Sequence, residues 1–281
     1  MVLLAASVQI GSALAVHVIR SVGVVEAAWL RTAFAALFLL AGVVALRRRA
    51  LRLPPRGERL AFAGLVLALL GMNLSFYGAI SRAPVGIVVA IEFLGPLAVA
   101  VMGMRRRVDW VWIGLAGAGV ALLAGPSSSV SGLGVALALF AGACWAAYLI
   151  LAKRAVTSLD PLTVTLLMTA GSALLLTPLL LASGVHIAGY GSAIALAIVV
   201  AITSSALPFV LELIALRRVR AATYGVLLSI EPALAALAGF LVLGQRLSLV
   251  EIVAIGAVMV AAAGASWTSG PGGPGVDVPP A

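Results

Sequence analysis

Long runs of apolar residues follow one another along most of the chain, separated by short polar segments. A helix needs about 20 predominantly apolar residues to cross a bilayer. Runs of this kind occupy residues 2–19, 25–46, 60–81, 84–104, 109–125, 131–152, 161–183, 193–216, 222–243 and 249–267. The pattern therefore predicts an all-α membrane protein with ten transmembrane helices.

The segments between the runs have the composition of loops. Arginines and prolines fill much of residues 47–59, and residues 105–107 are all arginine. Residues 125–129 and the pair Asp160-Pro161 have the composition of turns, and the pair also predicts the start of a helix. Residues 269–281 are rich in Gly and Pro, which predicts a disordered tail.

The composition supports a membrane protein and excludes a water-soluble enzyme. Hydrophobic residues make up 63% of the chain and charged residues 10%, with a mean hydropathy of +1.22. A soluble domain carries about 25% charged residues. The single cysteine, Cys144, allows neither an intrachain disulfide nor a thiolate metal cluster. Because HExxH, GxSxG and P-loop strings are absent from the sequence, we expect no metal, no cofactor, no enzymatic activity and no use of ATP.

The basic residues gather on one side of the predicted bundle. If the N-terminus is cytoplasmic, the cytoplasmic loops hold fourteen of them: Arg47, Arg48, Arg49, Arg52, Arg56, Arg59, Arg105, Arg106, Arg107, Lys153, Arg154, Arg217, Arg218 and Arg220. The opposite loops hold three, Arg20, Arg82 and Arg246. Cytoplasmic loops of membrane proteins are enriched in Lys and Arg. Both termini are therefore predicted to be cytoplasmic, and the net charge of +9 needs no nucleic-acid partner to explain it.

The second half of the chain resembles the first. Ile19-Arg20 falls on Lys153-Arg154 at an offset of 134 residues. Leu94-Gly95-Pro96 falls on Ile230-Glu231-Pro232 at an offset of 136 residues. Residues 1–125 and 131–268 are therefore predicted to be two five-helix repeats, followed by a cytoplasmic tail.

Two five-helix repeats must cross the membrane in opposite senses, because five is an odd number. The charges agree, since Arg105-Arg106-Arg107 is predicted at the cytoplasm and its counterpart Gly244-Gln245-Arg246 outside. Inverted repeats are a transporter architecture in which the substrate site lies near the middle of the membrane, where the repeats meet. The repeat thus favours a transporter over a scaffold or an intramembrane enzyme.

Several strings resemble a known family and cover nearly the whole chain. They are Gly71-Met72-Asn73 with Phe76-Tyr77, Pro84 to Ala100, Ala143 to Ala146, Ser205 to Glu212, and Ser229 to Ala236. With them the chain resembles the EamA branch of the drug/metabolite transporter superfamily, and within it the bacterial threonine and homoserine exporters. The resemblance implies ten helices and proton-coupled efflux of small amino acids across the bacterial inner membrane.

Two positions depart from the family pattern. Gln245 stands where the family often has Glu, and Val16-His17 stands where a lysine is expected. Because these departures put the substrate in doubt, an exporter of other metabolites or drugs in the same superfamily is the alternative. The oligomeric state stays open.

Four ionisable residues lie well inside predicted spans: Arg31, Glu92, Glu212 and Glu231. A charge at the bilayer centre costs about 2.5–3.5 kcal/mol on insertion scales, so such residues face the bundle interior or a wet cavity. At 1.5 Å per residue, Glu92 lies about 12 Å from the outer end of its span, and Glu231 about 13 Å from the cytoplasmic end of its own. Both acids are thus predicted near the membrane centre.

Three prolines are predicted to open backbone groups at this depth. Pro96, Pro208 and Pro232 lack an N–H, so each leaves the carbonyl four residues earlier without its helical partner. Those carbonyls belong to Glu92, Ser204 and Leu228. Open backbone at membrane depth is tolerated only beside protein, water or a ligand. The alternative is that the prolines only kink helices for packing.

These groups suit a zwitterionic amino acid. Its ammonium would lie against Glu92 or Glu231, and its carboxylate against Arg31. Because burial favours the neutral form of a carboxylic acid, Glu92 is also predicted to load and release the coupling proton. A buried structural pair of Glu92 with Arg31 is the alternative. For Glu212, a transport role and an interface salt bridge with Arg217 both stay open.

Neutral side chains complete the predicted site. Asn73, Tyr77, Trp145 and Tyr148 are candidates to contact the substrate, and for Asn73 and Tyr77 a role in holding helices together stays open. Gln9 is a further hydrogen-bonding candidate, and Ser75 is predicted to join helices. Gly114, Gly117 and Gly125 are predicted close-packing positions. His17 is predicted to be a packing or interface residue, with a proton role as the alternative.

Overall fold

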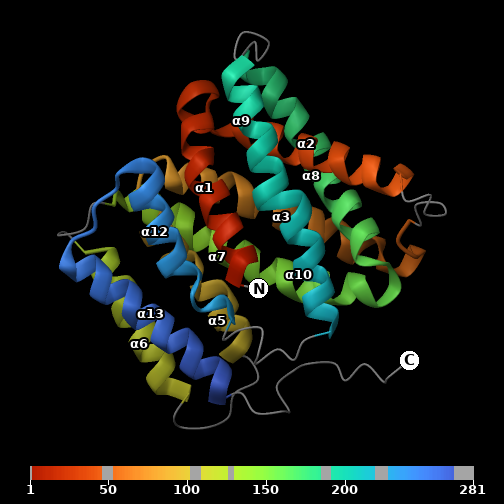
Figure 1. Cartoon of the computed structure of the whole chain (residues 1–281). Helices are drawn as coiled ribbons and strands as arrows, with labels where there is room; N and C mark the ends of the chain where they lie inside the picture. Colours follow the sequence, from red (N-terminus) through yellow and green to blue (C-terminus); the bar gives the residue numbers. More distant parts are fainter. Residues whose placement is uncertain are drawn as a thin grey trace.

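The computed structural model describes residues 2–45, 53–101, 109–125, 130–184, 191–218 and 227–268, and these residues are helical almost throughout, without a strand (Figure 1). The helices are α1 (Val2–Val22), α2 (Val24–Ala45), α3 (Arg59–Ile80), α4 (Val85–Glu92), α5 (Leu94–Val101), α6 (Asp109–Leu123), α7 (Gly132–Ser158), α8 (Pro161–Ser183), α9 (Gly191–Ala201), α10 (Leu207–Arg218), α12 (Glu231–Leu243) and α13 (Leu249–Thr268). A 3₁₀ turn, η1 (Arg56–Glu58), precedes α3, and a π-helical segment, η3 (Ile202–Ala206), joins α9 to α10.

The helices have the length and composition of membrane spans. Among the described residues, seven helical segments are long and apolar enough to cross a membrane: Val2–Val22, Val24–Ala45, Arg56–Ile80, Gly132–Ser158, Pro161–Ser183, Gly191–Ala215 and Leu249–Thr268. Three shorter apolar segments are Val85–Val99, Trp110–Leu123 and Glu231–Leu243. The prediction of an all-α, multi-pass membrane protein is therefore confirmed, while ten crossings in inverted repeats stay a prediction.

Two predicted spans differ from continuous helices. The run 84–104 is divided, because α4 ends at Glu92 and α5 begins at Leu94. In the run 222–243, residues 229–230 form a turn and α12 begins at Glu231. The breaks fall beside Pro96 and Pro232, which remove the helical bonds of the preceding turn. The arginines at 47–49 and 105–107 and the predicted tail lie outside the described residues.

The ends of helices follow local sequence signals. Asp160 precedes α8, and its carboxylate accepts hydrogen bonds from the main-chain N–H groups of Leu162 and Thr163 at 3.1 and 3.2 Å. Pro161 occupies the first turn of the same helix, where its missing N–H costs nothing. The helix start predicted at Asp160-Pro161 is thereby confirmed.

The main helix pairings join the first half of the chain to the second. Helix α3 packs on α7, α6 on α13, α2 on α8, and α1 on α12 and α9. The pair α6 and α13 lies along one edge of the bundle (Figure 1). The chain therefore folds as one interleaved bundle, in which α4 lies between α7 and α12.

Small residues set how closely α4 approaches its neighbours. A Cβ atom on Gly86 would lie 2.7 Å from the Cα of Ala236 on α12. In contrast, a Cβ atom on Gly114 or Gly117 would meet no atom of the described residues within 4 Å. The prediction that Gly114 and Gly117 are close-packing positions is therefore wrong, and the close approach occurs instead at α4.

Candidate functional site

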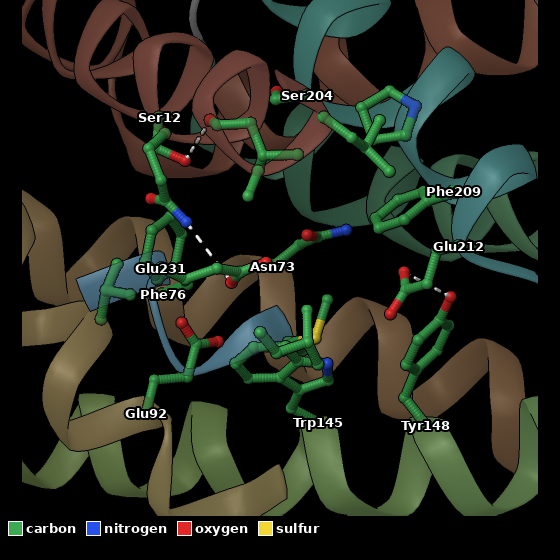
Figure 2. Close-up of a pocket in the computed structure, with 18 of the residues that line it drawn as sticks. Ser12, Asn73, Phe76, Glu92, Trp145, Tyr148, Ser204, Phe209, Glu212 and Glu231 are labelled. Carbon is green, nitrogen blue, oxygen red and sulfur yellow. Dashed lines mark hydrogen bonds between the residues drawn. The ribbon is translucent and has the colours of Figure 1, made fainter. Parts of the chain in front are cut away.

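A central cavity lies between α1, α2, α3, α4, α7, α10 and the start of α12 (Figure 2). It holds about 890 Å³ of empty space, including the part that is open to the outside. The predicted site residues on its wall are Arg31, Asn73, Glu92, Trp145, Tyr148, Pro208 and Glu231. Tyr77, Pro96 and Pro232 are not among the described residues that line it. Most of the predicted site is thus brought together in one place.

Three carboxylates face this cavity: Glu92, Glu212 and Glu231 (Figure 2). Glu92 and Glu231 are 7% and 8% exposed, so both are largely removed from solvent. Glu231 accepts a long hydrogen bond of 3.5 Å from the side-chain amide of Gln9 on α1. Glu92 has neither a hydrogen bond nor an ion pair within the described part of the chain. Its carboxyl group is therefore open to a ligand or a proton.

Arg31 is the one basic side chain among the described residues of the cavity wall. Its Nε donates a hydrogen bond to the Ser205 hydroxyl at 2.5 Å, and its Nη2 donates one to the Ser204 carbonyl at 2.9 Å. The rings of Tyr77 and Phe209 lie 5.4 and 5.8 Å from its Cζ, within cation–π range. The structure thus gives Arg31 serine and aromatic partners, and among the described residues it forms no direct ion pair with Glu92.

Pro208 explains why these serine oxygens are available. Since Pro208 has no N–H, α-helical pairing fails ahead of it, and the chain forms the π-helical segment η3 with a bond from the Leu207 N–H to the Ile202 carbonyl. The Thr203 carbonyl accepts instead from the Ser7 hydroxyl of α1 at 2.8 Å. Arg31 donates to the Ser204 carbonyl, the group that the sequence predicts to lack its helical partner.

Several neutral polar atoms are buried without a partner. Among the described residues, Asn73 Nδ2, Gln9 Oε1 and the Tyr77 hydroxyl make no hydrogen bond. Asn73 and Gln9 line the cavity and are 1% and 3% exposed. Buried polar groups are nearly always hydrogen-bonded, to protein or to water. Unpartnered amide groups on a cavity wall therefore mark where a polar ligand could bind.

Aromatic side chains form another part of the wall. Trp145 packs edge-on against Phe93, with the ring centroids 5.6 Å apart, and Tyr148 packs on Phe209 at 6.1 Å. The Tyr148 hydroxyl donates a hydrogen bond to Glu212 at 3.2 Å (Figure 2). The cavity therefore combines an apolar aromatic surface with charged groups.

Comparison with known proteins shows to which family this chain belongs. Residues 132–267 match the model of the EamA-like transporter family. The chain is 40% identical over 269 residues to the threonine/homoserine exporter RhtA of Escherichia coli K12, an alignment that covers 94% of this chain and 88% of the relative. It is also 40% identical to RhtA of Salmonella typhimurium SL1344, over 93% of this chain and 88% of the relative. The chain belongs to the EamA-like transporter family.

A solved structure supports the fold of this EamA-like transporter. One crystal structure matches with a TM-score of 0.65 at 17% identity, covering 94% of this chain and 97% of the other. At that identity the likeness concerns the fold alone. The matching family is a transporter family, and the curated relatives are named exporters. Both findings are consistent with a transport protein rather than an enzyme.

Two residues of this EamA-like transporter, Glu212 and Ser205, contribute more to the site than their sequence context indicates. Glu212 lines the cavity and binds Tyr148, while the side chain of Arg217, its predicted salt-bridge partner, lies outside the described residues. Ser205 was part of a matching string, but nothing in the string indicated that it binds Arg31. The signal that pointed to this region was Pro208, which predicted an opened backbone.

Other polar residues of this EamA-like transporter have structural roles. The Ser75 hydroxyl donates to the Gly71 carbonyl of its own helix at 2.5 Å, so the prediction that it joins helices is wrong. His17 is exposed on α1, so of its two predicted structural roles the structure favours an interface position over packing. Gln245, the departure from the family pattern, accepts a hydrogen bond from the Val85 N–H at 3.0 Å. Gln245 thus caps α4, the helix that carries Glu92.

Proposed function

We propose that this chain is an inner-membrane secondary transporter that exports small amino acids of the threonine and homoserine type, by exchange for protons. The observation that carries the proposal is the cavity in which Arg31 and the carboxylates of Glu92 and Glu231 share one wall. The 40% identity to threonine/homoserine exporters over 94% of the chain supports the substrate class.

The cavity offers a partner for each group of such a substrate. The ammonium lies against Glu92 or Glu231, and the carboxylate against Arg31. The unpartnered Asn73 Nδ2 and Gln9 Oε1 supply a donor and an acceptor, which suits a side-chain hydroxyl because a hydroxyl both donates and accepts. Leaving such buried groups unpaired is costly, so an amino acid that satisfies them is preferred over one that does not.

Coupling follows from competition for one carboxyl group. Glu92 is buried and has no protein partner among the described residues, so it binds either the substrate ammonium or a proton. A proton arriving from outside neutralises Glu92 and releases the substrate, and loss of that proton to the cytoplasm restores the charge for the next substrate. Exchange results because the two ligands exclude each other. Glu231, near the opposite helix break, is the second candidate for this role.

The proposed topology has ten crossings in two inverted repeats, 1–125 and 131–268, with both termini cytoplasmic. Ten apolar helical segments, the family match over 132–267 and the helix breaks at Glu92 and Glu231 support it. The cavity wall extends to Leu4 and Ala5 at the start of α1, which this topology places at the cytoplasm. Its substrate would then load from the cytoplasmic side.

The second candidate is an exporter of other metabolites or drugs in the same superfamily. The aromatic wall formed by Phe76, Trp145 and Phe209 favours it, because aromatic surface binds apolar ligands without regard to an amino-acid backbone. In this reading the charged groups serve coupling alone.

Growth and retention assays separate the two candidates. Cells expressing the chain are grown in inhibitory threonine, homoserine or a panel of unrelated drugs, and intracellular labelled amino acid is measured. The proposal expects greater tolerance to threonine or homoserine and lower retention of the label than in control cells. Unchanged retention together with tolerance to an unrelated drug establishes the second candidate instead.

A further inference from the structure

We propose that Ser205 is a positioning residue that holds Arg31 in the orientation that binds the substrate carboxylate, and that it thereby sets the affinity of the transporter for amino acids. The proposal rests on the proposed function, because it requires a substrate with a carboxylate. Ser205 is fully buried and is not among the described residues that line the cavity. Its action on the substrate therefore passes through Arg31.

The two serine oxygens occupy one edge of the guanidinium. Nε and Nη2 lie side by side on that edge, and they donate to the Ser205 hydroxyl and the Ser204 carbonyl. A guanidinium has five N–H donors. These two bonds occupy one edge of the group, and Arg31 also interacts with the side chain of Tyr77 beside it. The end formed by Nη1 and Nη2 carries further donors for another acceptor. A carboxylate binds such an end through two parallel hydrogen bonds.

The rest of the environment fixes the plane of the group. The side chain is 5% exposed, and the Tyr77 and Phe209 rings limit its movement. Rings packed beside a guanidinium limit its movement, but they do not determine which of its edges points toward the cavity. The orientation is set by η3, because its two oxygens bind one edge of the guanidinium and leave the other end directed toward the cavity.

The π-helical geometry is what supplies both oxygens. Pro208 leaves the Ser204 carbonyl without an N–H partner, and the wider turn of η3 places the next hydroxyl, that of Ser205, against Nε. π-Helical turns within α-helices occur frequently at functional sites. Here the π-helical turn provides two hydrogen-bond acceptors for Arg31, the single basic side chain among the described residues of the cavity wall.

Removing the hydroxyl has a specific consequence. Ser205→Ala leaves the Nε–H buried without an acceptor, so the guanidinium turns to find another partner and its free end no longer faces the substrate. Hydrogen bonds to charged groups contribute about 1.5–3 kcal/mol, which corresponds to about tenfold or more in affinity. The loss appears in KM, because the coupling carboxylates and the helix movements are unaltered.

The test measures KM and Vmax for exchange of labelled threonine and homoserine by the purified protein in liposomes. The variants are Ser205→Ala, Ser205→Thr, Arg31→Lys and the double variant Arg31→Lys/Ser205→Ala. Ser75→Ala is the matched control, because Ser75 is a buried serine whose hydroxyl bonds its own helix and lies outside the cavity wall.

The proposal expects Ser205→Ala to raise KM about tenfold with Vmax within about twofold, while Ser205→Thr and Ser75→Ala stay near the parent KM. In the Arg31→Lys background, where the Nε donor is gone, Ser205→Ala should change KM less than about twofold. If Ser205→Ala does not elute as a single species, Ser205→Cys replaces it, since sulfur is a weak acceptor.

Three outcomes overturn the proposal: an unchanged KM in Ser205→Ala, a loss of Vmax alone, or an equal loss of affinity with and without Arg31. A parent protein that exchanges neither amino acid refutes the proposed function, and this inference with it. A parent that exchanges them while Ser205→Ala matches it refutes the inference alone.

Discussion

Gly142 of α7 lies directly against the main-chain carbonyl of Glu92, where a Cβ atom on the glycine would be 2.6 Å from the carbonyl oxygen. That carbonyl is the one that Pro96 leaves without a helical partner. The contact seats the broken end of α4 on α7, and through it the Glu92 side chain is directed into the cavity (Figure 2). The position of the Glu92 carboxylate therefore depends on a residue that has no side chain.

Gly142→Ala is expected to destabilise the protein. The added methyl group meets main-chain atoms that cannot rotate away, and overpacking of this kind typically costs about 1–3 kcal/mol. The check is the thermal unfolding midpoint of the detergent-solubilised protein, which should fall by several degrees. Gly114→Ala is the control, because a Cβ there meets no described residue within 4 Å and alanine favours a helix over glycine by about 1 kcal/mol. Equal midpoints for the two variants would contradict the packing described here.

Gln245→Ala is expected to lower the same unfolding midpoint. The variant removes the acceptor of the Val85 N–H at the start of α4, and loss of a helix cap costs about 0.5–2 kcal/mol. Gln245→Glu should retain the midpoint, since it keeps an acceptor and places a negative charge at a helix N-terminus. If alanine and glutamate have the same effect, the cap contributes nothing and Gln245 needs another explanation.

The termini are expected on the cytoplasmic side. A reporter fused after Gly125 should report the outside, and one fused at residue 281 should report the cytoplasm, because fourteen basic residues against three orient the chain. A cytoplasmic signal from the fusion after Gly125 would refute both the topology and the inverted repeat.

Local signals allowed the helices and the breaks to be predicted from sequence. Apolar runs long enough to span a membrane gave the helical segments, and the absence of an N–H in Pro96, Pro208 and Pro232 placed the interruptions. Such features depend on a few neighbouring residues, so they can be found without knowing the rest of the fold. The convergence of Glu92 and Glu231 was also predictable, because depth in the membrane follows from the rise per residue.

Contacts between distant residues could not be predicted in this way. Arg31 binds η3, which lies 173 and 174 residues further along the chain, and no periodicity connects the two segments. The same holds for the hydrogen bond of Tyr148 to Glu212. Gly114 and Gly117 were misjudged because composition alone does not tell a glycine that faces another helix from one that faces outward.

Glu92 is the residue proposed to couple amino-acid export to protons. Glu92→Gln cannot take up the coupling proton, while Glu231 on the same cavity wall is still present to hold the substrate ammonium, so substrate can cross without being coupled to protons. Glu58→Gln is the matched control: Glu58 is exposed in η1 and accepts a hydrogen bond from Ser158 at 2.5 Å, which the amide oxygen of glutamine can also accept.

The most direct measurement is uphill transport of labelled threonine in proteoliposomes with an imposed pH gradient. The parent and Glu58→Gln should concentrate the label against its gradient, and Glu92→Gln should only equilibrate it. A Glu92→Gln protein that concentrates the label as strongly as the parent would contradict the account.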